Sequence, residues 1–166
     1  MAENDDSEVS RAATLADLTR ICNALNRKKV KYMLIGGFAV NYYGFSRATT
    51  DVDFLVDAST DNIEKLKEAL HTLGIETDDM PATDVETYTV VRIVEEVTID
   101  LLKSVGDINF SNAKAITAVA DGISIPVADI PTLIETKRGI REKDKIDLGF
   151  LIRVLNAQQQ NTIKVW

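Results

Sequence analysis

Two aspartates separated by one residue, Asp51 and Asp53, are the part of this sequence best suited to chemistry. They are inserted in an apolar run that reads as a strand, and side chains at i and i+2 of a strand point to the same face. Two carboxylates that lie so close repel each other unless a cation lies between them. Mg²⁺ and Mn²⁺ are hard ions that prefer oxygen ligands. The spacing therefore predicts a divalent-metal site on Asp51 and Asp53.

A third carboxylate, Asp100, lies in a second apolar run, from residue 97 to residue 102. Burying a carboxylate without a partner is costly, so this position needs a compensating group. If its strand lies beside the strand that carries Asp51 and Asp53, all three carboxylates can reach the same ion. The simpler interpretation, in which the three side chains lie at solvated strand ends or edges, stays open at this point.

A glycine pair, Gly36-Gly37, follows a strand predicted for residues 32–35 and precedes a short helix predicted for residues 38–43. Glycines at such a turn leave backbone N–H groups free, and together with a helix dipole these groups can bind anions. The order of strand, glycine turn, helix and paired carboxylates predicts a phosphate-binding turn beside the metal site.

This order of residues resembles the signature of the DNA polymerase β superfamily of nucleotidyltransferases: Gly36-Gly37, a spacer of twelve residues, Thr50-Asp51-Val52-Asp53, and Asp100 on a later strand. The resemblance extends from about residue 30 to residue 102. The segment that approaches Asp51 is similar to the minimal bacterial members, which include abortive-infection nucleotidyltransferase toxins. A second, looser block of similar residues lies near the C-terminus: Lys137, Gly139, Arg141, Lys143, Asp144 and Asp147.

The resemblance implies an α/β (α+β) fold in one domain, a nucleotidyltransferase-like mixed β-sheet flanked by helices. It implies that Asp51 and Asp53 ligate Mg²⁺ (or Mn²⁺), and that Asp100 completes the metal site and helps to activate an acceptor hydroxyl. Gly36 and Gly37 would hold the triphosphate, although many members carry Ser at the second glycine and Gly37 lacks that hydroxyl. The other residues expected to bind the nucleotide are Arg47, Thr50, Lys137, Arg141 and Lys143.

We therefore expect a metal-dependent nucleotidyltransferase that moves a nucleoside monophosphate from an NTP to a hydroxyl or phosphate acceptor on a protein, an RNA or a small molecule. A homodimer or a partner chain would complete the acceptor side. Two alternatives stay open: a catalytically inactive module that binds a nucleotide or a partner, such as an antitoxin in a toxin–antitoxin pair, and a glycosyltransferase, which the chain length disfavours. For the basic residues, the alternative is a solvated helix face paired with Asp144 and Asp147.

Composition limits the class of protein. The 166 residues fit one domain, and the formal net charge of -7 excludes attraction of nucleic acid or anionic lipid to the whole surface. The single cysteine, Cys22, excludes an internal disulfide and a thiolate zinc site. No apolar run approaches the roughly 20 residues of a membrane span, so we expect no membrane association and a cytoplasmic protein.

Periodicity predicts the elements that position these residues. Apolar residues at helical spacing predict a helix over 15–25, and a strand carries residues 52–56. Asp61 is the expected cap of a helix that ends at Gly74, and residues 78–86 read as a loop. A hairpin is expected from runs 88–94 and 97–102, separated by Glu95-Glu96, with a later strand at 123–127. Two helices follow, one from Asp129 through Lys137 and one around residues 148–155. We expect a disordered acidic tail at 1–10, a domain at 11–157 and a C-terminal tail at 158–166.

Overall fold

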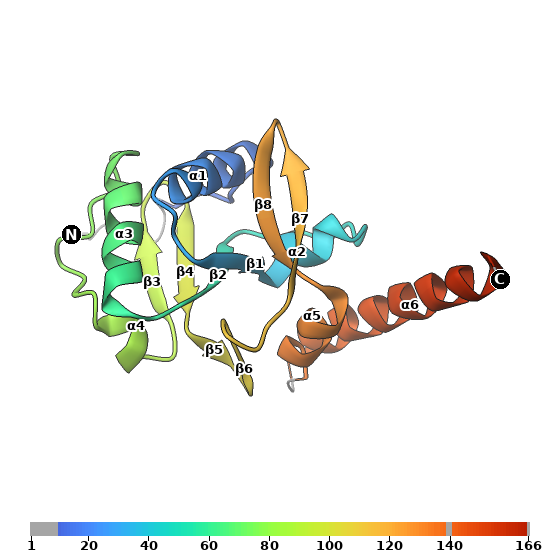
Figure 1. Ribbon diagram of the computed structural model, residues 1–166. Helices are drawn as coiled ribbons and strands as arrows, with labels where there is room; N and C mark the ends of the chain where they lie inside the picture. Colours follow the sequence, from blue (N-terminus) through green and yellow to red (C-terminus); the bar gives the residue numbers. More distant parts are fainter. Residues whose placement is uncertain (1–9, 139–140, 166) are drawn as a thin grey trace, which may run out of the picture.

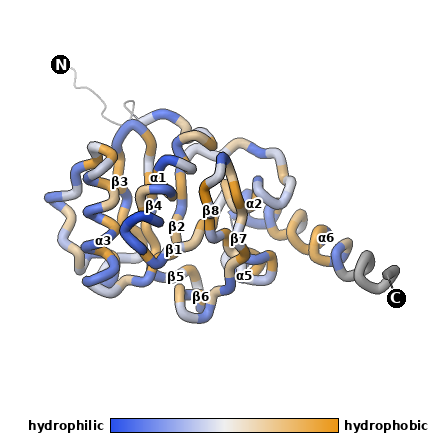
Figure 2. The backbone as a smooth tube through the Cα atoms, turned by 45° about the horizontal axis from the view of Figure 1, so that its top comes forward, coloured by the Kyte–Doolittle hydropathy of each residue, from blue (hydrophilic) through white to orange (hydrophobic). Residues whose placement is uncertain are grey.

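A six-stranded mixed sheet forms the centre of the molecule, with helices packed around it (Figure 1). The computed structural model describes residues 10–138 and 141–165, with side chains as far as residue 158. Figure 2 shows that hydrophobic residues follow the central strands, as expected for a buried sheet. In chain order the elements are α1 (Leu15–Arg27), β1 (Tyr32–Ile35), α2 (Gly36–Tyr42), β2 (Val52–Val56), α3 (Thr60–His71), α4 (Asp84–Thr87), β3 (Val91–Val94), β4 (Thr98–Leu102), β5 (Ser104–Val105), β6 (Ile108–Asn109), β7 (Ala115–Ala120), β8 (Ile123–Ala128), α5 (Ile130–Thr136) and α6 (Glu142–Val165).

The strand order, β3-β4-β2-β1-β8-β7, places the strand that carries Asp53 in the middle of the sheet. β2 runs antiparallel to β1 and parallel to β4, and antiparallel hairpins form both edges. In this register Asp53 lies opposite Ile35 of β1 and opposite Asp100 of β4. The pairing of β2 with β4 therefore brings Asp53 and Asp100 side by side in the sheet.

The strongest periodic segments have the predicted structure. α1, β1, β2 and α3 lie where the spacing of apolar residues indicated, and β3 and β4 pair as the predicted hairpin. α5 begins after Asp129, whose side chain accepts a hydrogen bond from the Thr132 N–H and so satisfies one of the free donors of the first turn. Within the described ranges, no helix is long and apolar enough to cross a membrane.

Three expectations about helix starts and loops were wrong. Ser59, not Asp61, caps α3 by accepting a hydrogen bond from the Asn62 N–H. The segment expected to be a loop at 78–86 contains the start of α4. Gly36 and Gly37 do not form a separate turn, because α2 begins directly at Gly36.

The C-terminal third also differs from the expectation. β8 has a hairpin partner, β7, which the sequence pattern did not indicate because most of its side chains are exposed. The turn between them, Asp121-Gly122, has φ values of 51° and 77°, typical of a tight hairpin. α6 continues to Val165, past the point where a C-terminal tail was expected to begin. Gly139 and the acidic tail up to residue 9 lie outside the described residues.

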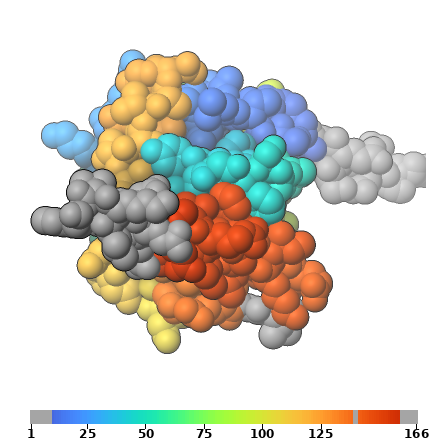
Figure 3. Space-filling view, turned by 90° about the vertical axis from the view of Figure 1, so that its right-hand side faces the viewer, coloured from blue at the N-terminus to red at the C-terminus, as the bar shows by residue number. Residues whose placement is uncertain are grey.

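α6 is attached to the rest of the molecule by an aromatic stack and a buried apolar residue. The rings of Phe45 and Phe150 stack with their centroids 4.8 Å apart, and Leu151 is fully buried. The space-filling view in Figure 3 shows the first part of α6 packed beside α2 and α5. The stretch between α2 and β2 is thereby held against a helix that lies about a hundred residues later in the chain.

A buried ion network reinforces this attachment. The carboxylate of Asp147, which has no exposed surface, accepts two hydrogen bonds from the Arg47 guanidinium, at 2.7 and 2.8 Å. Lys137 lies 3.0 Å from Asp147 and 3.6 Å from Asp144, and Arg141 donates to Asp144 at 2.8 and 3.2 Å. Two carboxylates of α6 thus hold three cations from three different segments.

Replacing Asp147 with Ala would leave the buried Lys137 with only the longer contact to Asp144. Removing one member of a buried ion pair typically costs about 3–5 kcal/mol, so we expect a fall of that size in the free energy of unfolding. Urea denaturation measures it. The matched control is Glu142→Ala, which removes an exposed pair with Lys145 on the same helix and should change stability by less than about 0.5 kcal/mol. Equal, small effects of the two substitutions would contradict a structural role for the network.

Candidate functional site

A cavity of about 500 Å³ opens beside the sheet at the point where β1 ends and β2 begins. Its walls come from α2, the segment before β2, the β3–β4 hairpin and the region between α5 and α6. All ten residues that the sequence analysis singled out line this one cavity: Asp51, Asp53, Asp100, Gly36, Gly37, Arg47, Thr50, Lys137, Arg141 and Lys143. The structure therefore brings together residues from four distant parts of the chain.

The three aspartates form one wall of the cavity. Asp100 is 5% exposed, and Asp53 lies beside it in the neighbouring strand. Burial raises the pKa of Asp53 to about 7, with further contributions from the nearby Asp100 and Asp51 carboxylates and an opposing effect of Lys137. A carboxyl group in this position readily shares a cation or holds a proton.

Gly36 allows the Asp53 carboxylate to approach the backbone of α2. Gly36 has a φ of +74°, and a Cβ atom at this position would lie 2.9 Å from Asp53 Cγ and nearer still to Oδ2. Any side chain there would displace the carboxylate. The glycine is thus required by the position of Asp53 as well as by the backbone conformation.

Arg92, on β3, lies across the same three carboxylates. Its guanidinium donates two hydrogen bonds to Asp100, at 2.8 and 3.0 Å, and lies 3.7 Å from Asp51. These hydrogen bonds and the Asp100 charge raise the pKa of Arg92. Arg92 therefore supplies positive charge that offsets part of the repulsion within the cluster.

The donor set suits a hard divalent cation. Asp51 and Asp53 contribute carboxylate oxygens to the cavity, and the pKa of Asp53 is raised mainly by burial and further by the charges of Asp100 and Asp51. As the side chains lie, no three Asp, Glu, His or Cys residues of the described ranges enclose a common metal position, and Asp100 is held by Arg92. Asp51 and Asp53 are the candidate ligands for a cation, which would replace the 3.7 Å contact of Arg92 with Asp51. Asp100 would have to share its oxygens with the cation or release Arg92.

A second group of side chains that line the cavity is basic. Arg47, Lys137 and Arg141 reach it while paired with Asp144 or Asp147, so the alternative of paired side chains applies to all three. Lys143 also lines the cavity and is exposed, with no ion-pair partner in the described parts of the chain. The cavity thus has an acidic wall suited to a cation and a basic wall suited to an anion.

Comparisons with known families and solved structures identify the family of the chain and its fold. Residues 14–165 match the family described as "Nucleotidyl transferase of unknown function (DUF2204)". The chain belongs to this nucleotidyl transferase family. No curated protein matches the chain at a significant level.

Solved antibiotic adenylyltransferases share the fold of this nucleotidyl transferase. The lincosamide antibiotic adenylyltransferase LnuA, solved with lincomycin bound, is 20% identical with a TM-score of 0.58, over 86% of this chain and 99% of that chain. The solution structure of the antibiotic-resistance factor ANT(2'')-Ia is 12% identical with a TM-score of 0.60, over 98% of this chain and 91% of that chain. A crystal structure of ANT(2'')-Ia with adenylyl-2''-tobramycin is 13% identical with a TM-score of 0.57, over 96% of this chain and 95% of that chain. These likenesses confirm the predicted mixed α/β fold.

Nine residues that line the nucleotidyl transferase cavity were not among the ten predicted ones, and four of the nine are polar: Thr49, Thr89, Arg92 and Thr136. The hairpin register expected from the sequence does not place Arg92 beside Asp100. A two-residue turn at Glu95-Glu96 would pair position 92 with position 99, but the turn contains one more residue, and Arg92 therefore pairs with Asp100. Thr49 belongs to the segment before Asp51 that resembles the minimal bacterial members, but the sequence assigned it no role in the site.

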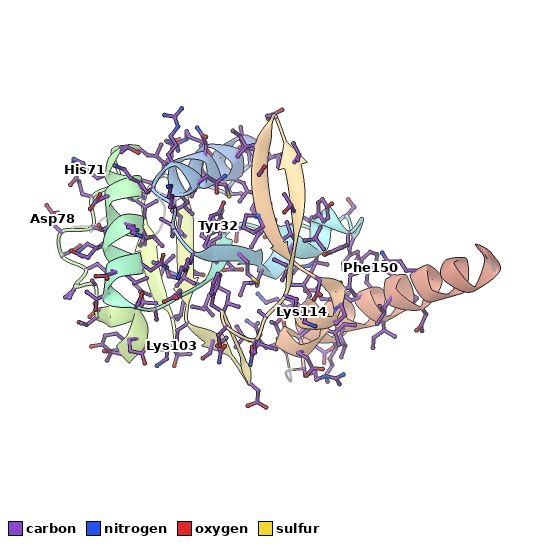
Figure 4. The ribbon with its side chains drawn as sticks, viewed as in Figure 1. Tyr32, His71, Asp78, Lys103, Lys114 and Phe150 are labelled. Carbon is purple, nitrogen blue, oxygen red and sulfur yellow. The ribbon has the colours of Figure 1, made fainter. Side chains whose placement is uncertain are left out.

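Several other polar or aromatic residues lie away from the cavity. Figure 4 shows His71 and Asp78 at the outer edge of the molecule beside α3, and His71 pairs with Glu76 at 3.0 Å. Tyr42 and Tyr43 contact each other edge to face and do not line the cavity. Cys22 is buried in α1, which agrees with a packing role for the thiol.

The shifted pKa of Asp53 predicts a pH-dependent stability in the presence of a chelator. The pKa rises from an ordinary 3.8 to about 7 on folding, so between these values the folded protein keeps a proton that the unfolded chain has lost. The contribution of Asp53 to the free energy of unfolding therefore falls as the pH rises from about 4 to about 7. In Asp53→Asn this fall should be smaller, by up to about 1.4 kcal/mol per pH unit. Urea denaturation at stepped pH compares the two proteins, and parallel pH profiles would contradict the assignment.

Proposed function

We propose that this nucleotidyl transferase moves a nucleoside monophosphate, most simply an adenylyl group from ATP, to a hydroxyl group of a small molecule. The observation that carries the proposal is that both kinds of charge line one cavity. Asp51 just before β2, Asp53 of β2 and Asp100 of β4 line the same cavity of about 500 Å³ as the basic side chains near α5 and α6. Phosphoryl transfer depends mainly on positioning and on neutralising charge, and these two walls can supply both.

Each wall has a separate part in the proposed reaction. The acceptor oxygen attacks the α-phosphorus, the bond from that phosphorus to the bridging oxygen breaks, and pyrophosphate leaves. Asp100 accepts the proton of the acceptor hydroxyl, once its oxygens are released from Arg92. Lys137, Arg141 and Lys143 neutralise the phosphates that leave.

Asp51 and Asp53 are the residues that would hold Mg²⁺ or Mn²⁺. Such an ion, when bound, supplies the positive charge that lets a triphosphate approach three carboxylates. Because the protein carries a net charge of -7, an anionic nucleotide has no general attraction to its surface. The cation and the basic wall therefore provide the local attraction that the whole surface lacks.

A small-molecule acceptor is supported by the size of the chain. The described residues form a six-stranded sheet and a small two-stranded sheet with their helices. The chain covers 91–99% of the length of the similar antibiotic adenylyltransferases, one solved with lincomycin and one with adenylyl-2''-tobramycin. The negative surface disfavours RNA as an acceptor. An abortive-infection toxin with a protein or RNA acceptor, and a homodimer that completes the cleft, remain predictions from the sequence resemblance.

The proposal predicts that Asp51→Asn and Asp53→Asn abolish nucleotide transfer. Mutating a residue that only hydrogen-bonds to a metal ligand typically lowers metal affinity or activity roughly 10- to 100-fold. Loss of the ligand itself should therefore lower the transfer rate at least about 100-fold. Transfer of radiolabelled nucleoside monophosphate from each of the four NTPs to a panel of hydroxyl-bearing small molecules, with Mg²⁺ or with a chelator, measures the effect. Full activity of either variant would contradict the assignment of Asp51 and Asp53 to the site.

Asp78→Asn is the matched control for these substitutions. Asp78 is an exposed aspartate at the far edge of the molecule, so its variant should keep wild-type activity (Figure 4). Thermal unfolding shows whether the inactive variants remain folded. Calorimetric titration with NTP and Mg²⁺ separates an enzyme from a module that only binds nucleotide, because such a module would bind without turnover.

A further inference from the structure

We propose that the hydroxyl of Thr49 is a ligand for the terminal phosphates of the nucleotide, and that it takes the place of a side chain that is absent at Gly37. This inference rests on the proposed function, because it assigns a residue to the triphosphate in the same cavity. It comes from the close approach of Thr49 to the backbone of α2.

Gly37 and Thr49 compete for the same space. A Cβ atom built at Gly37 would lie 2.8 Å from Thr49 Cβ and nearer still to Thr49 Oγ1. Real Cβ atoms do not approach other atoms so closely, so a side chain at position 37 and the present position of Thr49 exclude each other. The Thr49 hydroxyl therefore occupies the volume into which a side chain at position 37 would project.

The Thr49 hydroxyl is available for a ligand. Thr49 lines the cavity and is only partly buried, and its hydroxyl has no hydrogen-bond partner among the described residues. Arg47, the nearest cation, lies 3.4 Å from the same virtual Cβ position. A donor that faces an open cavity beside a cation is well placed to bind a phosphate oxygen.

Arg47 is less available than Thr49 for direct contact. Its guanidinium donates two hydrogen bonds to the buried Asp147 and one to the carbonyl of Ala48. The carboxylate of Asp147 offsets much of its charge. At this part of the cavity wall Thr49 thus supplies the free donor, while Arg47 is a fixed cation behind it.

The order of the two glycines along α2 indicates which phosphates Thr49 binds. A Cβ atom built at Gly36 would meet Asp53, whereas one built at Gly37, one residue further along, would meet Thr49. The transferred α-phosphate belongs beside Asp51 and Asp53 in the proposed reaction. Thr49 therefore lies where the β- or γ-phosphate would extend past the carboxylates.

The test is a set of substitutions that exchange the two side chains. The variants are Thr49→Ala, Thr49→Ser, Gly37→Ser and the double variant Gly37→Ser/Thr49→Ala. Isothermal titration with a non-hydrolysable ATP analogue and Mg²⁺ gives the dissociation constant, which does not depend on turnover. AMP serves as the matched ligand without terminal phosphates, and Thr117→Ala, an exposed threonine of β7, is the matched protein control.

We expect Thr49→Ala to weaken binding of the triphosphate about 10- to 100-fold, the usual effect of losing a hydrogen bond to a charged group, and to leave AMP binding unchanged. Thr49→Ser keeps the hydroxyl and should bind within about threefold of wild type. Gly37→Ser alone should weaken binding through its clash with Thr49. The double variant should bind more tightly than either single variant, because removing the Thr49 side chain makes room for the serine hydroxyl.

The outcomes separate this inference from the proposed function. Equal triphosphate affinity of wild type and Thr49→Ala would overturn the role of Thr49 while leaving nucleotide binding intact. Equal losses for the triphosphate and for AMP would also overturn it, because they would show a general disturbance of the cavity. If wild type binds no nucleotide, both the proposed function and the role of Thr49 fall. Melting temperatures identify any variant that has not folded, and Thr49→Ala with Thr49→Ser then suffices for the test.

Discussion

Electrostatic repulsion among Asp51, Asp53 and Asp100 is the constraint on which the rest of the cavity depends. The parallel register of β2 and β4 sets Asp53 directly beside Asp100, in a position where water screens the charges only in part. The protein offsets this repulsion with the Arg92 guanidinium on Asp100 and with a raised pKa of Asp53. A bound divalent cation would make both unnecessary. The cluster is therefore suited to give up the Asp53 proton and the Arg92 contact in exchange for such a cation.

The basic wall depends on a different balance of charge. Lys137 is almost completely buried and Asp147 is completely buried, so each of these charges depends on its ion-pair partners in the network. α6 supplies the carboxylates, and the segment before β2 supplies Arg47. The same network therefore attaches α6 to the sheet and holds cations at the mouth of the cavity. Stability and the proposed phosphate binding are linked here, because the groups that fix the helix also fix the position of the positive charges.

The glycine pair explains how the two walls come so close to the backbone of α2. Gly36 makes room for the Asp53 carboxylate, and Gly37 makes room for Thr49. The absence of side chains at positions 36 and 37 thus determines the shape of the cavity as much as the charged residues that line it.

The sequence by itself determined the elements with strong periodicity and the residues of the cavity. Alternation and helical spacing are local properties, and they located α1, β1, β2, α3 and the β3–β4 hairpin, while the order of glycines and aspartates indicated the superfamily. Only the tertiary structure decided which charges meet. The pairing of Arg92 with Asp100 depends on one extra residue in a turn, and the contact of Arg47 with Asp147 joins segments that are far apart in the chain. The place of Thr49 against Gly37 depends on how a loop crosses a helix, and no local pattern of residue types encodes such a distance.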